Sequence, residues 1–288
     1  MEIRLEDLQK LLLGRYMVKQ NIGTGGMGSV YKVLCTEDNR VYAAKIIPEG
    51  GLCDGRSEAE ILRSLHHPML PEFREYVEGE GFVIIIMEFI CGCTLKDLVE
   101  KSGVISKNSI VYMLRQLADV LLYLHNQSPP VIYRDLKPAN IMVEGRDRLR
   151  LIDFGIARNY KRFSENDTVA LGTPGYAAPE QLMGSNQSDV RTDIYALGAT
   201  MYFAITGKDI GKPPFEMEPI HILRSGIDRY IAEIIEQCLQ NNPQKRFQSI
   251  TELLSALDVG GYPGKKGKIK NYKSINIMIT HSSKNIMV

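Results

Sequence analysis

The 288-residue sequence has no tryptophan, only five cysteines and a formal net charge of only +1. Five scattered cysteines do not suit a disulfide framework or a four-ligand zinc site, so they favour a reducing compartment. The near-neutral charge gives no reason to expect nucleic acid or an anionic membrane as a partner. No 18-residue window is continuously apolar, so we expect no membrane span within this chain and a cytoplasmic location.

The sequence does contain enough apolar residues, 44%, to build a substantial core in one large domain or two lobes. Its most distinctive stretch is residues 131–143, where a polar cluster lies between two apolar runs. Asp135, Lys137 and Asn140 supply a carboxylate that can accept a proton, an amine that can steady an anion, and an amide oxygen that can bind a hard cation. Asp153 follows at the end of another apolar run.

Residues 23–28 form a glycine-rich turn after a predicted strand over residues 16–22. Glycines allow a backbone to approach phosphate groups without clashes from Cβ atoms. A dinucleotide-binding loop has the same glycine spacing, but it should open a helix. Because residues 29–33 are β-branched and alternating, we favour a strand–turn–strand loop that folds over phosphates.

Lys45 lies within an apolar strand predicted over residues 41–47, where it needs a partner or an outlet to solvent. The next predicted helix, residues 57–65, offers Glu58 and Glu60 as partners. Glu58 shares a helix face with the apolar residues three, four and seven positions later, whereas Glu60 lies on a polar face. We therefore predict that Glu58 points inward and pairs with Lys45.

Further helices are predicted in the C-terminal two thirds of the chain. Thr94 and Asp97 resemble a capping box that opens a short helix, and Ser106 can cap a long helix that extends to His125. Three more helices are expected at about residues 193–206, 227–240 and 251–258.

These motifs occur in the order typical of the protein kinase superfamily, which the chain resembles over roughly residues 16–258. The glycine-rich turn and Gly172-Thr-Pro-Gly-Tyr176 are similar to those of bacterial eukaryotic-like serine/threonine protein kinases. The resemblance implies an α+β, two-lobed protein kinase fold that binds ATP between its lobes. The small lobe, residues 16–88, would be an antiparallel β-sheet with one helix, and the larger lobe, residues 91–258, would be mainly helical.

The resemblance also implies the reaction, transfer of the γ-phosphoryl group of Mg-ATP to a serine or threonine of a protein substrate. Asp135 would be the base that accepts the hydroxyl proton, and Lys137 would steady the transferred group. Asn140 and Asp153 would hold Mg²⁺, with Mn²⁺ as an alternative ion. Lys45 would contact the α- and β-phosphates.

An ATP-binding set follows from the same resemblance. The backbone of Glu88 and Ile90 would hydrogen-bond adenine, and Met87 would line the back of its pocket. Without the neighbouring motifs, these positions would read as core residues and an ordinary strand end. The full set is Ile22, Gly23, Thr24, Gly25, Gly26, Met27, Gly28, Val30, Ala43, Lys45, Met87, Glu88, Ile90 and Met142.

Specificity for serine and threonine is inferred from Lys137 and from Thr173, which resembles the threonine that bonds the catalytic aspartate and lysine in such enzymes. Tyr133 stands where many family members have histidine, and we interpret it as a packing residue. The resemblance implies that Glu180 is buried with Arg246 as its distant partner, since an unpaired buried carboxylate is costly. Asp193 would anchor the backbone of the catalytic loop.

The polar segment before Gly172 is the activation segment by position. Arg134 needs an anion, and a phosphate on Thr168, or on Ser164, would satisfy it and order the segment. Autophosphorylation within a homodimer would supply that phosphate. The alternative is that a carboxylate of the same segment already fills this role.

The two ends of the chain differ from the kinase-like part. Residues 1–15 are predicted to be a helical extension, because leucines recur at helical spacing. Residues 259–288 form a basic linker and a strand-like tail. The tail is either the start of a truncated second domain or a strand that packs on this domain or on a neighbouring copy.

Two other functions are compatible with the same resemblance. A pseudokinase scaffold that only binds nucleotide usually lacks the lysine, the base or the metal aspartate, but all are present here. A small-molecule phosphotransferase is disfavoured by Thr173 and by Ala178-Pro-Glu180, which shape a platform for protein substrates in the family.

Overall fold

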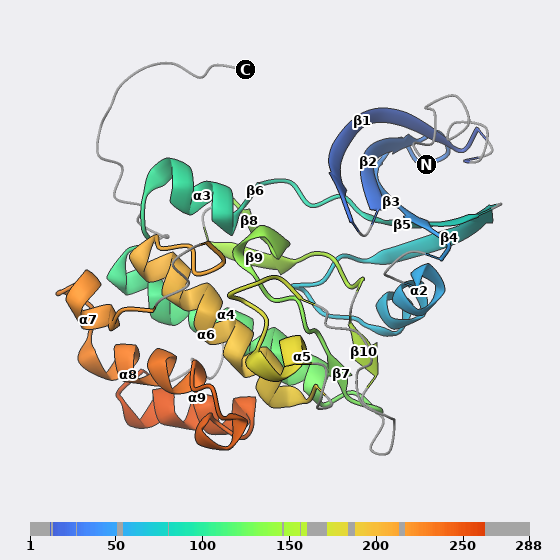
Figure 1. Cartoon of the computed structure of the whole chain (residues 1–288). Coiled ribbons are helices and arrows are strands. Elements are labelled where there is room, and N and C mark those ends of the chain that lie inside the picture. The colour runs from blue at the N-terminus through green and yellow to red at the C-terminus, as the bar shows by residue number, and fades with distance from the viewer. Residues whose placement is uncertain are drawn as a thin grey trace, which may run out of the picture. The chain divides into compact units, whose positions relative to one another are not determined.

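A computed structural model describes residues 12, 14–26, 28–50, 54–79, 81–145, 147–155, 157–159, 172–183, 188–212 and 217–262. The chain divides into two compact units (Figure 1). Of the residues that the structure describes, the first unit contains those up to Cys91 together with those between 150 and 159, and the second unit contains the others. Predictions for Met27, Ser164, Thr168, the tail beyond residue 262 and nearly all of the N-terminal helix lie outside the described residues.

The first unit is built on a five-stranded antiparallel sheet in the order β1-β2-β3-β5-β4. β1 and β2 curl strongly, as Figure 1 shows in blue. The strands are β1 (Tyr16–Gly25), β2 (Gly28–Cys35), β3 (Val41–Pro48), β4 (Phe73–Gly79) and β5 (Phe82–Glu88).

Both faces of β5 are covered, which explains its continuous apolar sequence. Ile84 and Ile86 belong to a core cluster on one face that also contains Leu12 and Tyr16. On the other face, Val83 lies against the start of α2 (Gly55–Ser64), which packs on β4 and β5. Asp54 caps α2 by accepting a hydrogen bond from a backbone amide of its first turn.

Residues 150–159 belong to the first unit, although a division into consecutive segments places them in the larger lobe. The reason is long-range bonding: the Leu151 amide donates to the Met69 carbonyl at 2.8 Å, and the Phe154 amide donates to Glu58 Oε1 at 3.2 Å. The predicted bounds of the two lobes, residues 16–88 and 91–258, stay a prediction.

The second unit is mainly helical, and α6 is its centre because nearly all of its side chains are buried. α4 and α8 pack against α6, as Figure 1 shows for α4 and α6. The helices are α3 (Leu95–Ser102), α4 (Lys107–His125), α5 (Pro179–Met183), α6 (Val190–Thr206), α7 (Ile220–Leu223), α8 (Arg229–Cys238) and α9 (Ile250–Val259), with 3-10 turns at Pro138–Asn140 and Pro243–Lys245.

Several short strands complete the structure. β6 (Cys93–Thr94), β8 (Ile141–Glu144) and β9 (Arg148–Leu151) form a small sheet, and β7 (Val131–Ile132) and β10 (Arg158–Asn159) are two residues long. The predicted combination of an antiparallel sheet unit and a mainly helical unit is confirmed. Within the part of the chain that the structure describes, no helix has the length and apolarity needed to cross a bilayer.

The N-terminal ends of α3, α4 and α6 can be compared with the predicted caps and helix bounds. The Thr94 hydroxyl accepts from the Asp97 amide at 3.0 Å, so this cap is confirmed. The prediction for Ser106 is wrong in its chemistry: Ser106 precedes α4, but its hydroxyl lies 2.9 Å from the Ser109 hydroxyl and makes no capping bond to the backbone. α6 begins about one turn earlier than expected because Asp189 caps it.

Candidate active site

Lys45 lies at the centre of a buried charge cluster in the first unit. Its side chain is only 4% exposed on β3, and its Nζ lies 2.7 and 2.8 Å from the two carboxylate oxygens of Glu58. Asp153 Oδ1 is 2.6 Å from the same nitrogen. Glu60 on the same helix is exposed, so the helical periodicity selected the correct glutamate.

The cluster contains one cation and two carboxylates. Burial alone would lower the pKa of Lys45, but the carboxylates of Glu58 and Asp153 outweigh this effect and raise it, so the amine stays charged. Burial raises the pKa of Glu58, although Lys45 opposes the shift. The excess of negative charge suits a divalent cation, for which carboxylate oxygens are preferred ligands.

Asp153 has an unusual backbone conformation for a residue with a Cβ atom, with φ of 72°. Its carboxylate accepts hydrogen bonds from Lys45 and, at 3.1 Å, from the Gly155 amide. Such strained residues persist where surrounding contacts determine their conformation, and they concentrate at functional sites. The side chain keeps 29% of its surface exposed, which leaves room for a ligand.

The glycine-rich turn joins β1 to β2, so the strand–turn–strand prediction is confirmed and the dinucleotide alternative, which needed a helix here, is wrong. Gly28 is required by the fold itself, since it has φ of 127° and an added Cβ would lie 2.1 Å from the Ile46 carbonyl oxygen. Gly23, Gly25 and Gly26 have open space where a Cβ would stand. The fold does not demand these three glycines, but a phosphate that approaches the backbone would.

The predicted adenine-contacting residues lie at several places. Ala43 on β3 and Met87 on β5 are buried and lie opposite each other in the sheet. Val30 on β2 lies opposite Lys45 on β3. Glu88 is the last residue of β5. The remaining positions of the set are Ile22, which is exposed, Thr24 near the end of β1, Ile90, which is buried, and Met142, which lies on β8 in the second unit.

Asp135 is the centre of a second polar cluster, which lies in the second unit. Its Oδ2 lies 2.8 Å from Lys137 Nζ, and its Oδ1 accepts from the Thr173 hydroxyl at 3.2 Å. The Thr173 hydroxyl in turn accepts from Lys137 at 2.8 Å. Asn140 donates its amide nitrogen to the Asp135 carbonyl and carboxylate, at 3.0 and 2.8 Å, so the amide oxygen is the Asn140 atom suited to a cation.

Asp193 holds the backbone that precedes Asp135. Its carboxylate accepts from the amides of Tyr133 and Arg134, at 2.9 and 2.7 Å, and so supports the left-handed conformation of Arg134, with φ of 69°. His125 Nε2 lies 2.8 Å from Asp193 Oδ2. The sequence analysis did not identify His125 as part of this cluster, and its only signal was a histidine at the end of a helix.

Gln181 is a second residue that the sequence analysis missed. It is 1% exposed, and its amide donates to the Arg134 carbonyl and accepts from the Ala178 amide, both at 3.0 Å. One buried side chain therefore joins the catalytic loop to the Ala-Pro-Glu segment. A glutamine beside a buried glutamate carries no periodic signal that would have identified it.

Glu180 and Arg246 form the long-range pair that the sequence predicted. The guanidinium contacts both carboxylate oxygens, at 2.7 and 2.8 Å. Tyr133 is fully buried, in agreement with a packing role. The residues that would face Arg134 from the activation segment lie outside the described part of the chain.

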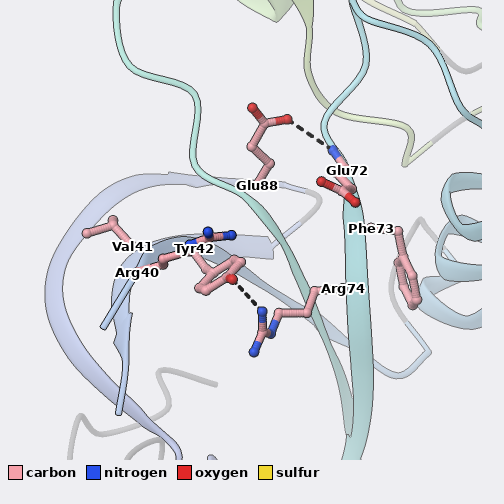
Figure 2. A pocket seen from close by; sticks show the side chains of 7 residues that line it. All are labelled: Arg40, Val41, Tyr42, Glu72, Phe73, Arg74 and Glu88. Atoms are coloured by element: carbon pink, nitrogen blue, oxygen red, sulfur yellow. Dashed lines mark hydrogen bonds between the residues drawn. The ribbon is translucent and has the colours of Figure 1, made fainter. Parts of the chain in front are cut away.

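A pocket of about 470 Å³ opens on the first unit, and Figure 2 shows its lining. Glu88 is its only residue that also belongs to the predicted ATP-binding set. The polar groups bond one another: Arg74 contacts the Tyr42 hydroxyl, and Glu88 Oε2 accepts from the Glu72 amide at 3.2 Å. The full lining is Arg40, Val41, Tyr42, Glu72, Phe73, Arg74 and Glu88.

Comparisons with known proteins agree with this arrangement. Residues 16–257 match the protein kinase domain family. A probable serine/threonine-protein kinase of Clostridium acetobutylicum is 30% identical over 272 residues, which cover 86% of this chain and 40% of that protein. Serine/threonine-protein kinase PknB of Mycobacterium leprae is 29% identical over 269 residues (85% of this chain, 43% of that protein), and PLK2 of Mus musculus is 28% identical over 249 residues (81% and 36%).

The chain belongs to the protein kinase family, and the resemblance inferred from its motifs is confirmed. The relatives named above are serine/threonine kinases, and two of them are bacterial. The chain spans less than half of the length of each of these relatives.

Proposed function

We propose that this chain is a catalytically active serine/threonine kinase that transfers the γ-phosphoryl group of Mg-ATP to a protein hydroxyl group. The observation that carries the proposal is the simultaneous contact of Lys45 with Glu58 and Asp153. In protein kinases this lysine–glutamate pair and the metal-binding aspartate must both be in place for phosphoryl transfer. The relatives' assignment to serine/threonine kinases supports the choice of acceptor.

The first unit would supply nucleotide binding. The three unconstrained glycines of the turn would bring backbone amides to the phosphates, and Lys45 would contact the α- and β-phosphates. The backbone of Glu88 and Ile90 would hydrogen-bond adenine. Asp153 and the amide oxygen of Asn140 would hold Mg²⁺, which would neutralise charge on the phosphate oxygens.

The second unit would supply the chemistry at the acceptor. As the serine or threonine oxygen forms its bond to the γ-phosphorus, the bond to the bridging oxygen of ADP breaks, and Asp135 takes the hydroxyl proton. Thr173 and Lys137 both contact the Asp135 carboxylate, so they hold it in place. Lys137 would also balance charge on the transferred group.

The Asp135→Asn variant tests this assignment. The substitution keeps the size of the side chain but removes the base, so turnover should fall by about 10²–10⁴-fold while ATP binding is retained. The measurement is phosphosite mapping by mass spectrometry and steady-state turnover on a generic protein substrate with Mg-ATP. Equal turnover in the variant and the parent would contradict the role of Asp135.

We also propose that the kinase phosphorylates its own activation segment, at Thr168 or at Ser164, and that Arg134 binds the phosphate. Phosphate on either residue in the parent chain, but not in Asp135→Asn, is the expected result. Dilution of the kinase would slow the reaction if one copy acts on another. No phosphate in either sample, with nucleotide binding retained, would favour the pseudokinase scaffold or a kinase that waits for a partner or another enzyme.

A further inference from the structure

Arg150 is a buried cation to which the proposed reaction assigns no role. Its side chain is 3% exposed, and arginine cannot lose its charge in a protein. Its guanidinium makes a two-point contact with Glu88: Nη1 lies 3.1 Å from Oε1, and Nη2 contacts Oε2. Nη2 also donates to the Leu70 carbonyl at 2.9 Å. Two-point guanidinium–carboxylate contacts are strong and fix the orientation of both groups.

Glu88 is held at its backbone as well as its side chain. Its amide donates to the Glu72 carbonyl at 2.8 Å, and its Oε2 accepts from the Glu72 amide at 3.2 Å (Figure 2). Arg150 therefore binds the side chain of a residue whose backbone is already held at the end of β5. We call the contact of Arg150 with Glu88 and the Leu70 carbonyl the Arg150 clamp.

Asp153 is only three residues beyond the Arg150 clamp. Three residues reach at most about 10 Å, so fixing Arg150 limits where Asp153 can lie. The chain between them is tied by the Leu151 amide, which donates to the Met69 carbonyl at 2.8 Å. Beyond Asp153, the Phe154 amide donates to Glu58 at 3.2 Å. All of these contacts lie within the first unit.

We propose that Arg150 is a positioning residue that fixes Asp153 for metal binding by anchoring its segment on Glu88 at the end of β5. The inference rests on the proposed function, because Asp153 and Glu88 are the residues assigned there to Mg²⁺ and adenine. Loss of the guanidinium removes one of the anchors that bracket Asp153. The hydrogen bonds from the Leu151 and Phe154 amides remain. The segment should therefore become more mobile but keep its place in the first unit.

Hydrogen exchange measures the loosening without relying on activity. In Arg150→Ala, amides of residues 150–155 should exchange about tenfold faster, because the segment opens more easily once its hydrogen bonds to a charged group are lost. Arg150→Lys should be intermediate, because lysine keeps the charge but cannot make the two-point contact. Arg148→Ala is the matched control, since Arg148 lies on the same strand, is 54% exposed and contacts Glu144 at 3.3 Å.

Unchanged exchange of residues 150–155 in Arg150→Ala would overturn the proposal. Equal acceleration in β1 and β2 would also overturn it, because that pattern indicates general destabilisation. If Arg150→Ala does not fold, Arg150→Lys and Glu88→Gln carry the same test, since each weakens the clamp and keeps the volume of the site.

ATP affinity measured with Mg²⁺ and with EDTA supplies a second readout. The factor by which Mg²⁺ increases ATP affinity should be about tenfold smaller in Arg150→Ala than in the parent chain. The ATP affinity of the variant in EDTA should stay close to that of the parent chain. The same gain from Mg²⁺ in both proteins would contradict the positioning role. A parent chain that binds no ATP would instead refute the proposed function, and the exchange experiment would still decide whether Arg150 holds the segment.

Discussion

The two units bury charge in different ways. In the first unit, Lys45 faces two carboxylates, those of Glu58 and Asp153, so the cluster carries an excess of negative charge. In the second unit, Arg246 faces the single carboxylate of Glu180. Both cations are almost completely buried, so the difference lies in how their charges are balanced and not in their exposure.

Arg246 uses all five of its donors. Two go to Glu180, and the others go to backbone carbonyls of Gln240, Arg191 and Asn241, at 2.7, 2.9 and 3.2 Å. Such a closed arrangement has no place for a ligand and serves the structure. The Lys45 cluster contains one carboxylate more than it has cations. The proposed function places a metal–nucleotide complex beside it. Of these two clusters, the proposed function assigns chemistry to the one whose charges are unbalanced.

Lys45→Met tests the unbalanced cluster and should have the largest effect. Turnover should fall by about 10²–10³-fold, the usual loss when one fixed donor to transition-state charge is removed, while the chain still unfolds cooperatively. Steady-state kinetics and thermal unfolding measure the two properties. Full activity in this variant would show that Lys45 is not the phosphate-contacting lysine.

The pH dependence of Lys45→Met sharpens the same point. Without the amine, burial raises the pKa of Glu58 further above its ordinary value of 4.5. A carboxyl with a raised pKa in the folded state contributes stability below its unfolded pKa and loses it as pH rises through the folded value. The stability deficit of the variant should therefore shrink between pH 7 and pH 5 in urea unfolding. Adding Glu58→Gln should abolish this trend.

Arg246→Met tests the balanced pair and should act on stability instead of chemistry. Leaving Glu180 buried without its partner should lower the free energy of unfolding by about 3–5 kcal/mol. The turnover of the remaining folded protein should stay close to that of the parent chain. Glu180→Gln together with Arg246→Met should cost less than the sum of the single changes, because the two residues are in contact. Additive losses would indicate that the pair is not coupled.

The Asp38→Asn variant removes an exposed carboxylate, and its effect on stability should be the smallest of these changes. Hydrogen bonds from the Tyr42 hydroxyl and the Arg40 amide, with Arg74 nearby, lower the pKa of Asp38 from 3.8 to about 2. A carboxyl with a lowered pKa contributes stability above its unfolded pKa and loses it as pH falls through the folded value. Asp38→Asn should remove a small part of the acid-induced loss between pH 4 and pH 2, measured by thermal unfolding. An identical acid profile would contradict the shift.

Much of the candidate site could be predicted because its signals are local. Helical periodicity distinguished Glu58 from Glu60, and the alternation after the glycine-rich turn indicated a strand. Arg150 was missed although it stands in an apolar run, as Lys45 does, and a buried charge needs a partner in either place. The same rule applied to β9 would have identified Arg150 as a residue that requires an anion.

The sequence by itself determined the strands, most helices and the order of the kinase motifs, because hydrophobic periodicity and turn chemistry act over a few neighbouring residues. Only the tertiary structure showed that Lys45 also meets Asp153 and that Arg150 meets Glu88. Lys45 lies 108 residues from Asp153, and Arg150 lies 62 residues from Glu88. These two contacts depend on how distant segments pack against one sheet, and no local pattern in the chain specifies them.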